Sequence, residues 1–152
     1  MKVLRSSERH RPSWRRRAGQ GAACSLALAL CAAQAWAATG LPAPLTSVPG
    51  DPVQGLRIAQ GREAQCALCH ALPGSTVRQG NIGPGLQGVA MRLTPAMLRL
   101  RLVDSRQINP ASLMPAYHST EGLVQVGKAW AGLPVLAAQD IEDVLAYLLT
   151  LN

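Results

Sequence analysis

The chain has 152 residues and a formal net charge of +7, from 15 basic and 8 acidic side chains. Residues 1–37 hold seven of the basic side chains and one acidic one, so the remaining chain carries eight basic and seven acidic side chains. A nearly neutral remainder excludes a nucleic-acid-binding protein, which would need a basic surface on its folded domain.

The N-terminal segment predicts export. A basic stretch that ends at Arg17 is followed by an apolar run over residues 21–33 and by the small-x-small sequence Ala35-Trp36-Ala37. These are the parts of a secretory signal peptide over residues 1–37, cleaved after Ala37 or alternatively after Ala35. The apolar run is too short to span a bilayer, so we expect a periplasmic protein without a membrane anchor.

A leader and a first helix follow. Residues 38–50 are rich in Pro, Gly, Ser and Thr and predict a flexible leader. Asp51 and Pro52 are typical of a helix start, an N-cap followed by proline at the first helical position. We expect this helix to reach about Arg62, with buried contacts from Val53, Leu56 and Ile58.

The motif Cys66-Ala67-Leu68-Cys69-His70 predicts the attachment site of a c-type haem. Two thiols three positions apart lie on one side of a tight turn and can add to the two vinyl groups of one porphyrin. His70 then becomes an axial ligand of the iron. Removal of residues 1–37 leaves Cys66 and Cys69 as the only cysteines, which suits an exported protein with one haem.

Three alternative interpretations of the motif have less support from the sequence than haem attachment. A thioredoxin-type CxxC needs a strand before it, and no strand pattern precedes Cys66. A zinc site with His118 would require the adjacent Cys69 and His70 to bind the same ion. A disulfide between Cys66 and Cys69 would leave His70 unexplained.

A glycine-rich loop and a second helix come next. Residues 71–90 predict an irregular loop, in which the carbonyl of Pro84 could accept the second ring N–H of His70. Arg78 or Arg92 could neutralise a haem propionate or could simply be solvated. Thr94 and Pro95 predict the start of a helix that runs to about Ser105.

Residues 109–134 predict another loop, and it holds the candidate for the second axial ligand. Met114 precedes Pro115 in this loop, and a thioether there could reach iron from the face opposite His70. Met97 lies among apolar residues of a helix and Met91 near the glycine-rich loop, so we expect both to pack. His118 is the remaining alternative. If Met114 only covered an open haem, ligand binding or enzymatic chemistry at iron would be possible.

The last segment, residues 138–149, places apolar side chains at helical spacing, and Ala137 predicts a weak N-cap. The resulting order of helix, haem motif, loop, helix, loop and helix predicts an all-α fold. We expect a small class I cytochrome c-like domain over residues 51–152, with crossed N- and C-terminal helices around one covalently bound haem.

Several segments together resemble one cytochrome family. They are CALCH at 66–70, QGNIGPGL at 79–86, GVA at 88–90, Asp104, Asn109-Pro110, MPAYH at 114–118 and QDIEDVLAYL at 139–148. Over residues 54–151 the chain resembles SoxX, the monohaem cytochrome subunit of the SoxAX complex of bacterial sulfur oxidation.

This resemblance implies a heterodimer with a SoxA-like cytochrome subunit in a thiosulfotransferase-type complex. The partner would join thiosulfate oxidatively to a cysteine of a SoxYZ-like carrier protein. This chain would accept the electrons through a haem attached at Cys66 and Cys69, with axial ligands His70 and Met114, and pass them to a soluble acceptor cytochrome. It would hold no catalytic nucleophile. The alternatives are a free periplasmic electron shuttle and an enzyme with substrate at iron.

Overall fold

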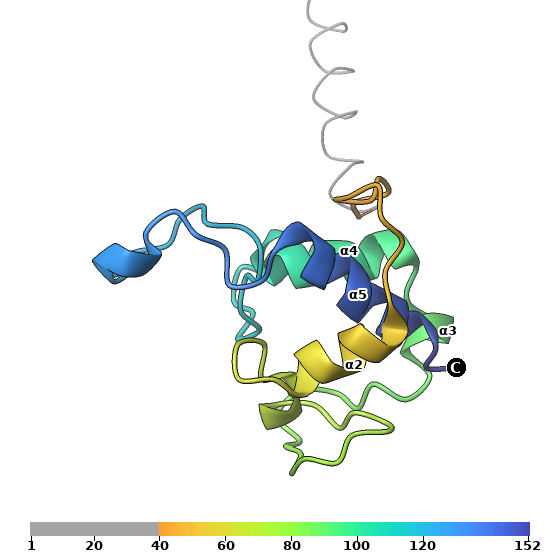
Figure 1. Ribbon diagram of the computed structural model, residues 1–152. Coiled ribbons are helices and arrows are strands. Elements are labelled where there is room, and N and C mark those ends of the chain that lie inside the picture. Colours follow the sequence, from red (N-terminus) through yellow and green to blue (C-terminus); the bar gives the residue numbers. More distant parts are fainter. Residues whose placement is uncertain (1–39) are drawn as a thin grey trace, which may run out of the picture. The chain divides into compact units, whose positions relative to one another are not determined.

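The computed structural model describes residues 40–152, and the predicted signal peptide over residues 1–37 lies outside them (Figure 1). Across the described residues the structure contains helices and loops and no strand, which confirms the all-α prediction. The α-helices are α2 (Pro52–Gln60), α3 (Val89–Arg92), α4 (Pro95–Asp104) and α5 (Ala138–Leu149). Residues 40–152 also contain three short 3-10 turns: η1 (Cys66–Leu68), η2 (Ser105–Gln107) and η3 (Lys128–Trp130).

The predicted helix starts are capped as expected. The Asp51 carboxylate accepts hydrogen bonds from the backbone N–H groups of Val53 (2.8 Å) and Gln54 (3.3 Å), and Pro52 occupies the first helical position. At α4, the Thr94 hydroxyl accepts from the N–H of Met97 (3.3 Å). These side chains satisfy N–H groups that have no partner inside their own helices.

Helices α2 and α5 cross at a glycine, as the predicted layout requires (Figure 1). A Cβ on Gly55 would overlap the backbone carbonyl of Asp143 in α5, so the two helix backbones approach each other closely there. The buried residues of α2 are Gly55 and Ala59. The prediction that Val53 is buried is wrong, because this small-residue face turns Val53 outward, where it is 66% exposed.

The core lies between α4 and α5 and extends to the loops. Helix α5 buries Ile141, Val144, Leu145 and Leu148, and α4 contributes Leu98 and Leu102. Ala137 offers no side-chain cap, but the Asp140 carboxylate accepts from the Ala137 N–H (2.9 Å) and so supplies half of a capping box.

The segment predicted as a flexible leader is bound to the helices. Arg99 of α4 and Glu142 of α5 form a buried ion pair (2.7 Å). Arg99 also donates to the carbonyl of Leu41 (2.7 Å), and the N–H of Leu45 donates to Glu142 (2.9 Å). The composition of this segment predicted flexibility, and no sequence pattern indicated the contacts that hold it, because their partners lie far along the chain.

Residues 119–135 form a long excursion that includes η3 and extends away from α5 in Figure 1. It carries several exposed apolar side chains, among them Val124 and Trp130. No helix among residues 40–152 is long and apolar enough to cross a membrane.

Candidate functional site

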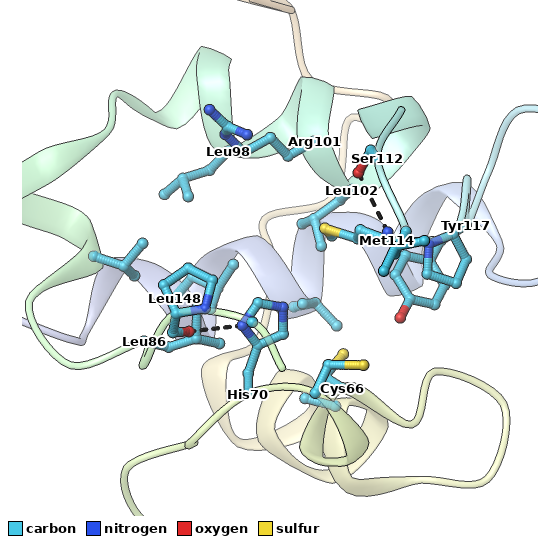
Figure 2. A pocket seen from close by; sticks show the side chains of 18 of the residues that line it. Cys66, His70, Leu86, Leu98, Arg101, Leu102, Ser112, Met114, Tyr117 and Leu148 are labelled. Atoms are coloured by element: carbon cyan, nitrogen blue, oxygen red, sulfur yellow. Dashed lines mark hydrogen bonds between the residues drawn. The ribbon is translucent and has the colours of Figure 1, made fainter. Parts of the chain in front are cut away.

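A cavity of about 650 Å³ lies between the Cys66–His70 segment, α4, α5 and the loop around Met114 (Figure 2). Its walls are mainly apolar and include Leu86, Val89, Leu98, Leu102, Val144 and Leu148. All four residues predicted to hold a haem line it: Cys66, Cys69, His70 and Met114. The fold therefore brings together two segments that are far apart in the sequence.

The turn η1 places both thiols at the cavity wall. The N–H groups of Cys69 (3.2 Å) and His70 (2.9 Å) both donate to the carbonyl of Cys66, which winds the motif into a tight turn. Both cysteines are half-buried and free. This geometry puts the two sulfur atoms and the imidazole on one side of the backbone, as attachment of a single flat group requires.

The ring of His70 is fixed by the glycine-rich loop. Its Nδ1 lies 2.7 Å from the carbonyl oxygen of Pro84, as the sequence predicted. Because a carbonyl can only accept, Nδ1 carries a proton, and in the neutral imidazole this leaves the lone pair on Nε2. Gly83 lies against the ring so closely that a Cβ there would overlap it. His70 is thus held in the tautomer that a metal ligand needs.

The loop itself is fastened along the motif by backbone hydrogen bonds. The N–H groups of Gly80, Gly83 and Leu86 donate to the carbonyls of Ala67 (2.8 Å), Cys69 (2.7 Å) and Ala71 (2.9 Å). The side-chain amide of Gln79 bonds both backbone groups of Leu72 (3.1 and 2.9 Å). Several hydrogen bonds therefore fix the loop that places Pro84 beside His70.

Met114 enters the cavity from the wall that faces His70 (Figure 2). Its N–H donates to the hydroxyl of Ser112 (3.2 Å), and its carbonyl accepts from the hydroxyl of Ser105 (2.7 Å). The two serines also bond each other (2.9 Å). Sequence reasoning missed both serines, because no motif spacing links them to the methionine that they fix.

The other candidate ligands lie elsewhere. Met91 is 80% exposed, so the expectation that it packs is wrong. Met97 and His118 do not line the cavity, and Nδ1 of His118 lies 2.9 Å from the carbonyl of Leu136. Residues 40–152 contain no cluster of three or more His, Cys, Asp or Glu side chains placed to hold a metal ion.

The Cys66 thiol does not have the character of the reactive thiol in a redox-active CxxC. Burial raises the pKa of the Cys66 thiol, and the nearby Tyr117 hydroxyl opposes this only partly. Catalytic CxxC cysteines have a lowered pKa, which keeps a thiolate available. Burial, followed by the influence of Cys66, also raises the pKa of Tyr117, whose hydroxyl donates to the carbonyl of Ala64 (2.7 Å).

The arginines that line the cavity are only partly those that the sequence suggested as partners of a haem propionate. Arg78 does not line the cavity, and Arg92 does but donates to the carbonyls of Gln87 (2.6 Å) and Gly85 (3.1 Å). Arg101 of α4 also lines the cavity, and its Nε is buried without a hydrogen-bond partner among residues 40–152. An unsatisfied buried donor costs about 1–3 kcal/mol.

These features fit a haem. The apolar walls suit the porphyrin, the two thiols suit covalent attachment, and an imidazole and a thioether face the space from different walls. The unpaired Nε of Arg101 is a donor that a carboxylate of such a group could satisfy. The residues present therefore agree with the cofactor that the motif predicted.

Comparison with solved structures gives a match to the crystal structure of SoxXA from P. pantotrophus. The sequence identity is 33%, the TM-score is 0.69, and the match covers 74% of this chain and 90% of that chain. No protein-family model and no curated protein matches this chain. Fold and sequence thus agree with the resemblance, and the domain is a small all-α cytochrome c-like fold.

Proposed function

This chain belongs to the SoxX family of cytochrome subunits, and we propose that it transfers electrons in a periplasmic complex that oxidises thiosulfate. The observation that carries the proposal is the meeting of His70 and Met114 in one cavity beside Cys66 and Cys69. In this proposal the signal peptide over residues 1–37 directs the export of the domain over residues 51–152.

Each site residue has a distinct role in the proposal. Cys66 and Cys69 would hold one haem through thioether bonds, and His70 and Met114 would be the ligands of its iron. When bound, the haem supplies a one-electron redox centre, and histidine with methionine ligation favours a high reduction potential. Pro84 keeps the proton of His70 on Nδ1, and Ser105 with Ser112 keeps Met114 at the cavity.

The arrangement favours electron transfer over chemistry at the metal. With His70 and Met114 both committed as ligands, the chain leaves no position for a substrate. Cys66 and Cys69 are consumed by attachment, and residues 40–152 contain no other cysteine that could act as a nucleophile. This chain is therefore the electron-accepting subunit, and the bond-forming step belongs to its partner.

That step follows from the chemistry of thiosulfate. A sulfur of thiosulfate forms a bond to the sulfur of a cysteine on a SoxYZ-like carrier, the thiol proton is lost, and two electrons are released. A SoxA-like subunit catalyses the bond formation. This chain takes the electrons one at a time and passes each to a soluble acceptor cytochrome.

A lasting partner is supported by the surface. Many large apolar side chains are exposed among residues 40–152, and a partner that covered them would remove this apolar surface from water. The most exposed are Leu113, Val124, Met91, Ile82, Trp130 and Val53. The matched structure is of SoxXA, and by analogy we assign a SoxA-like subunit as the partner. A free shuttle, the second candidate, would not need this apolar surface.

Isolation of the tagged chain from the periplasm of its native host tests the assignment. We expect a second, larger haem-staining subunit to copurify in a fixed ratio, and the tagged chain itself to stain for haem. Elution of the tagged chain alone as a low-spin cytochrome would reject the heterodimer and favour the free shuttle. Absence of haem stain on the tagged chain would reject the function altogether.

A further inference from the structure

Arg101 is the one cavity-lining cation that the described structure leaves without a partner. It lies on α4 with Leu98 and Leu102, three and one positions away, and all three side chains line the cavity. The other two arginines of this region are engaged. Arg99, on another face of α4, pairs with Glu142, and Arg92 donates to two backbone carbonyls.

The place of Arg101 in the cavity indicates what it would bind. Figure 2 shows Arg101 across the cavity from Cys66, at the α4 wall. The two vinyl groups of a haem lie at one edge of the porphyrin and its two propionates at the opposite edge. A haem attached at Cys66 and Cys69 therefore presents its carboxylates away from the thiols.

We propose that the guanidinium of Arg101 binds a haem propionate, and that this pairing raises the reduction potential of the haem. The inference rests on the proposed haem site. A planar guanidinium can form two parallel hydrogen bonds with a carboxylate, which would give the buried Nε its missing acceptor. The pairing also offsets a negative charge that would otherwise stabilise the oxidised iron.

The reduction potential of the isolated haem-bearing chain tests the proposal. We expect Arg101→Gln to lower the potential, because the propionate then keeps an uncompensated charge. Arg101→Lys should restore most of the potential, since a cation remains. The matched control is Arg78→Gln, which removes the same charge from an exposed loop residue outside the cavity and should leave the potential unchanged.

A structural role alone would produce a different pattern. If Arg101 only packs against α4, Arg101→Gln would change stability but leave the potential of the folded protein at the wild-type value, and this result would overturn the proposal. Resonance Raman bands of the propionate groups give a second readout, and they should shift in Arg101→Gln and not in Arg78→Gln.

The wild-type protein keeps the proposal testable if Arg101→Gln yields no holoprotein. In a crystal structure of the haem-bearing chain, a propionate oxygen should lie within hydrogen-bond distance of the Arg101 guanidinium. A guanidinium without such a contact would overturn the assignment while leaving the electron-transfer function intact. A chain that carries no haem would overturn both.

Discussion

His70 shows how single residues prepare the site. A histidine after a CxxC pair is recognisable in any sequence, but its use as a ligand depends on which ring nitrogen carries the proton. The carbonyl of Pro84 fixes that proton on Nδ1, and Gly83 leaves just enough room for the ring. The sequence Gly83-Pro84-Gly85 is therefore part of the site, although none of its residues is a ligand.

Substitution of Gly83 by alanine tests this role. The added Cβ would overlap the ring of His70, so we expect a low yield of haem-bearing protein and a loss of stability of about 1–3 kcal/mol. Gly85→Ala is the matched control, since its Cβ would meet nothing closer than Ala71 at 3.9 Å. Haem content and denaturant unfolding measure both variants, and equal behaviour of the two would contradict the account.

Met114 is held by its backbone as well as by its side chain. Ser105 and Ser112 fix the peptide groups on both sides of its Cα, so the thioether faces the cavity without relying on packing alone. These hydrogen bonds would let a loop residue act as the defined ligand that we propose.

Replacement of Met114 by leucine tests the ligand directly. We expect the methionine-to-iron charge-transfer band at the red end of the oxidised spectrum to disappear and the reduction potential to fall. Met91→Leu is the control, because Met91 is exposed and outside the cavity. Persistence of the band in Met114→Leu would show that another residue is the ligand.

At the scale of elements, the crossing of α2 and α5 positions the haem motif. Gly55 lets the two helix backbones approach, and Gly50 lies equally close to the carbonyl of Glu142. A short connection over residues 61–65 joins α2 to η1, so the depth of the crossing influences the positions of Cys66 and His70. The crossing explains why small residues, not large apolar ones, form the buried face of α2.

We therefore expect Gly55→Ala to destabilise the domain by about 1–3 kcal/mol or more, because its Cβ would overlap the Asp143 backbone, which cannot move alone. Gln54→Ala, at the neighbouring exposed position of α2, should change stability by less than about 0.5 kcal/mol. The midpoint of denaturant unfolding distinguishes them, and a neutral Gly55→Ala would mean that the helices do not cross as described.

The pair of Arg99 and Glu142 joins the leader, α4 and α5, and it gives stability a pH dependence. Burial alone would raise the pKa of Glu142, but Arg99 and the N–H of Leu45 outweigh burial and lower it. A carboxyl whose pKa falls on folding adds stability above its unfolded pKa of about 4.3, and this stability is lost as pH falls through the folded value.

Glu142→Gln should accordingly lower stability at pH 7, by about 3 kcal/mol, since Arg99 keeps a buried charge without its counterion. The variant should also lose less stability than the wild type below pH 4. Some acid sensitivity remains, because Asp104 also has a lowered pKa, which its hydrogen bond to Arg106 produces. Glu121→Gln, at an exposed position, is the control, and an unchanged pH profile in Glu142→Gln would reject this explanation.

Much of this architecture could be predicted from local signals, and the failures have physical reasons. Asp51, Thr94 and the apolar spacing of α5 act within one turn of helix, so their effects are readable in sequence. The binding of residues 41–45, the outward turn of Val53 and the cavity position of Arg101 depend on distant partners. Such long-range contacts leave no periodic pattern for sequence reasoning to detect.

For the molecule as a whole, the cavity and the core form one structure. Four residues line the cavity and also belong to the buried hydrophobic core: Leu98, Leu102, Val144 and Leu148. A haem in this space would complete the apolar core of a domain with few aromatic residues. The same arrangement leaves apolar side chains exposed around Leu113 and on the excursion over residues 119–135, where a partner subunit could contact them.

The central claim is that this chain accepts electrons from thiosulfate oxidation. The most direct measurement is the visible absorbance of its haem in the isolated complex, after thiosulfate is added with and without the carrier protein. The account predicts reduction of this haem when the SoxA-like partner, the carrier and thiosulfate are all present, and no reduction when the carrier is omitted. A haem that stays oxidised in the complete mixture, yet is reduced by dithionite, would contradict the claim.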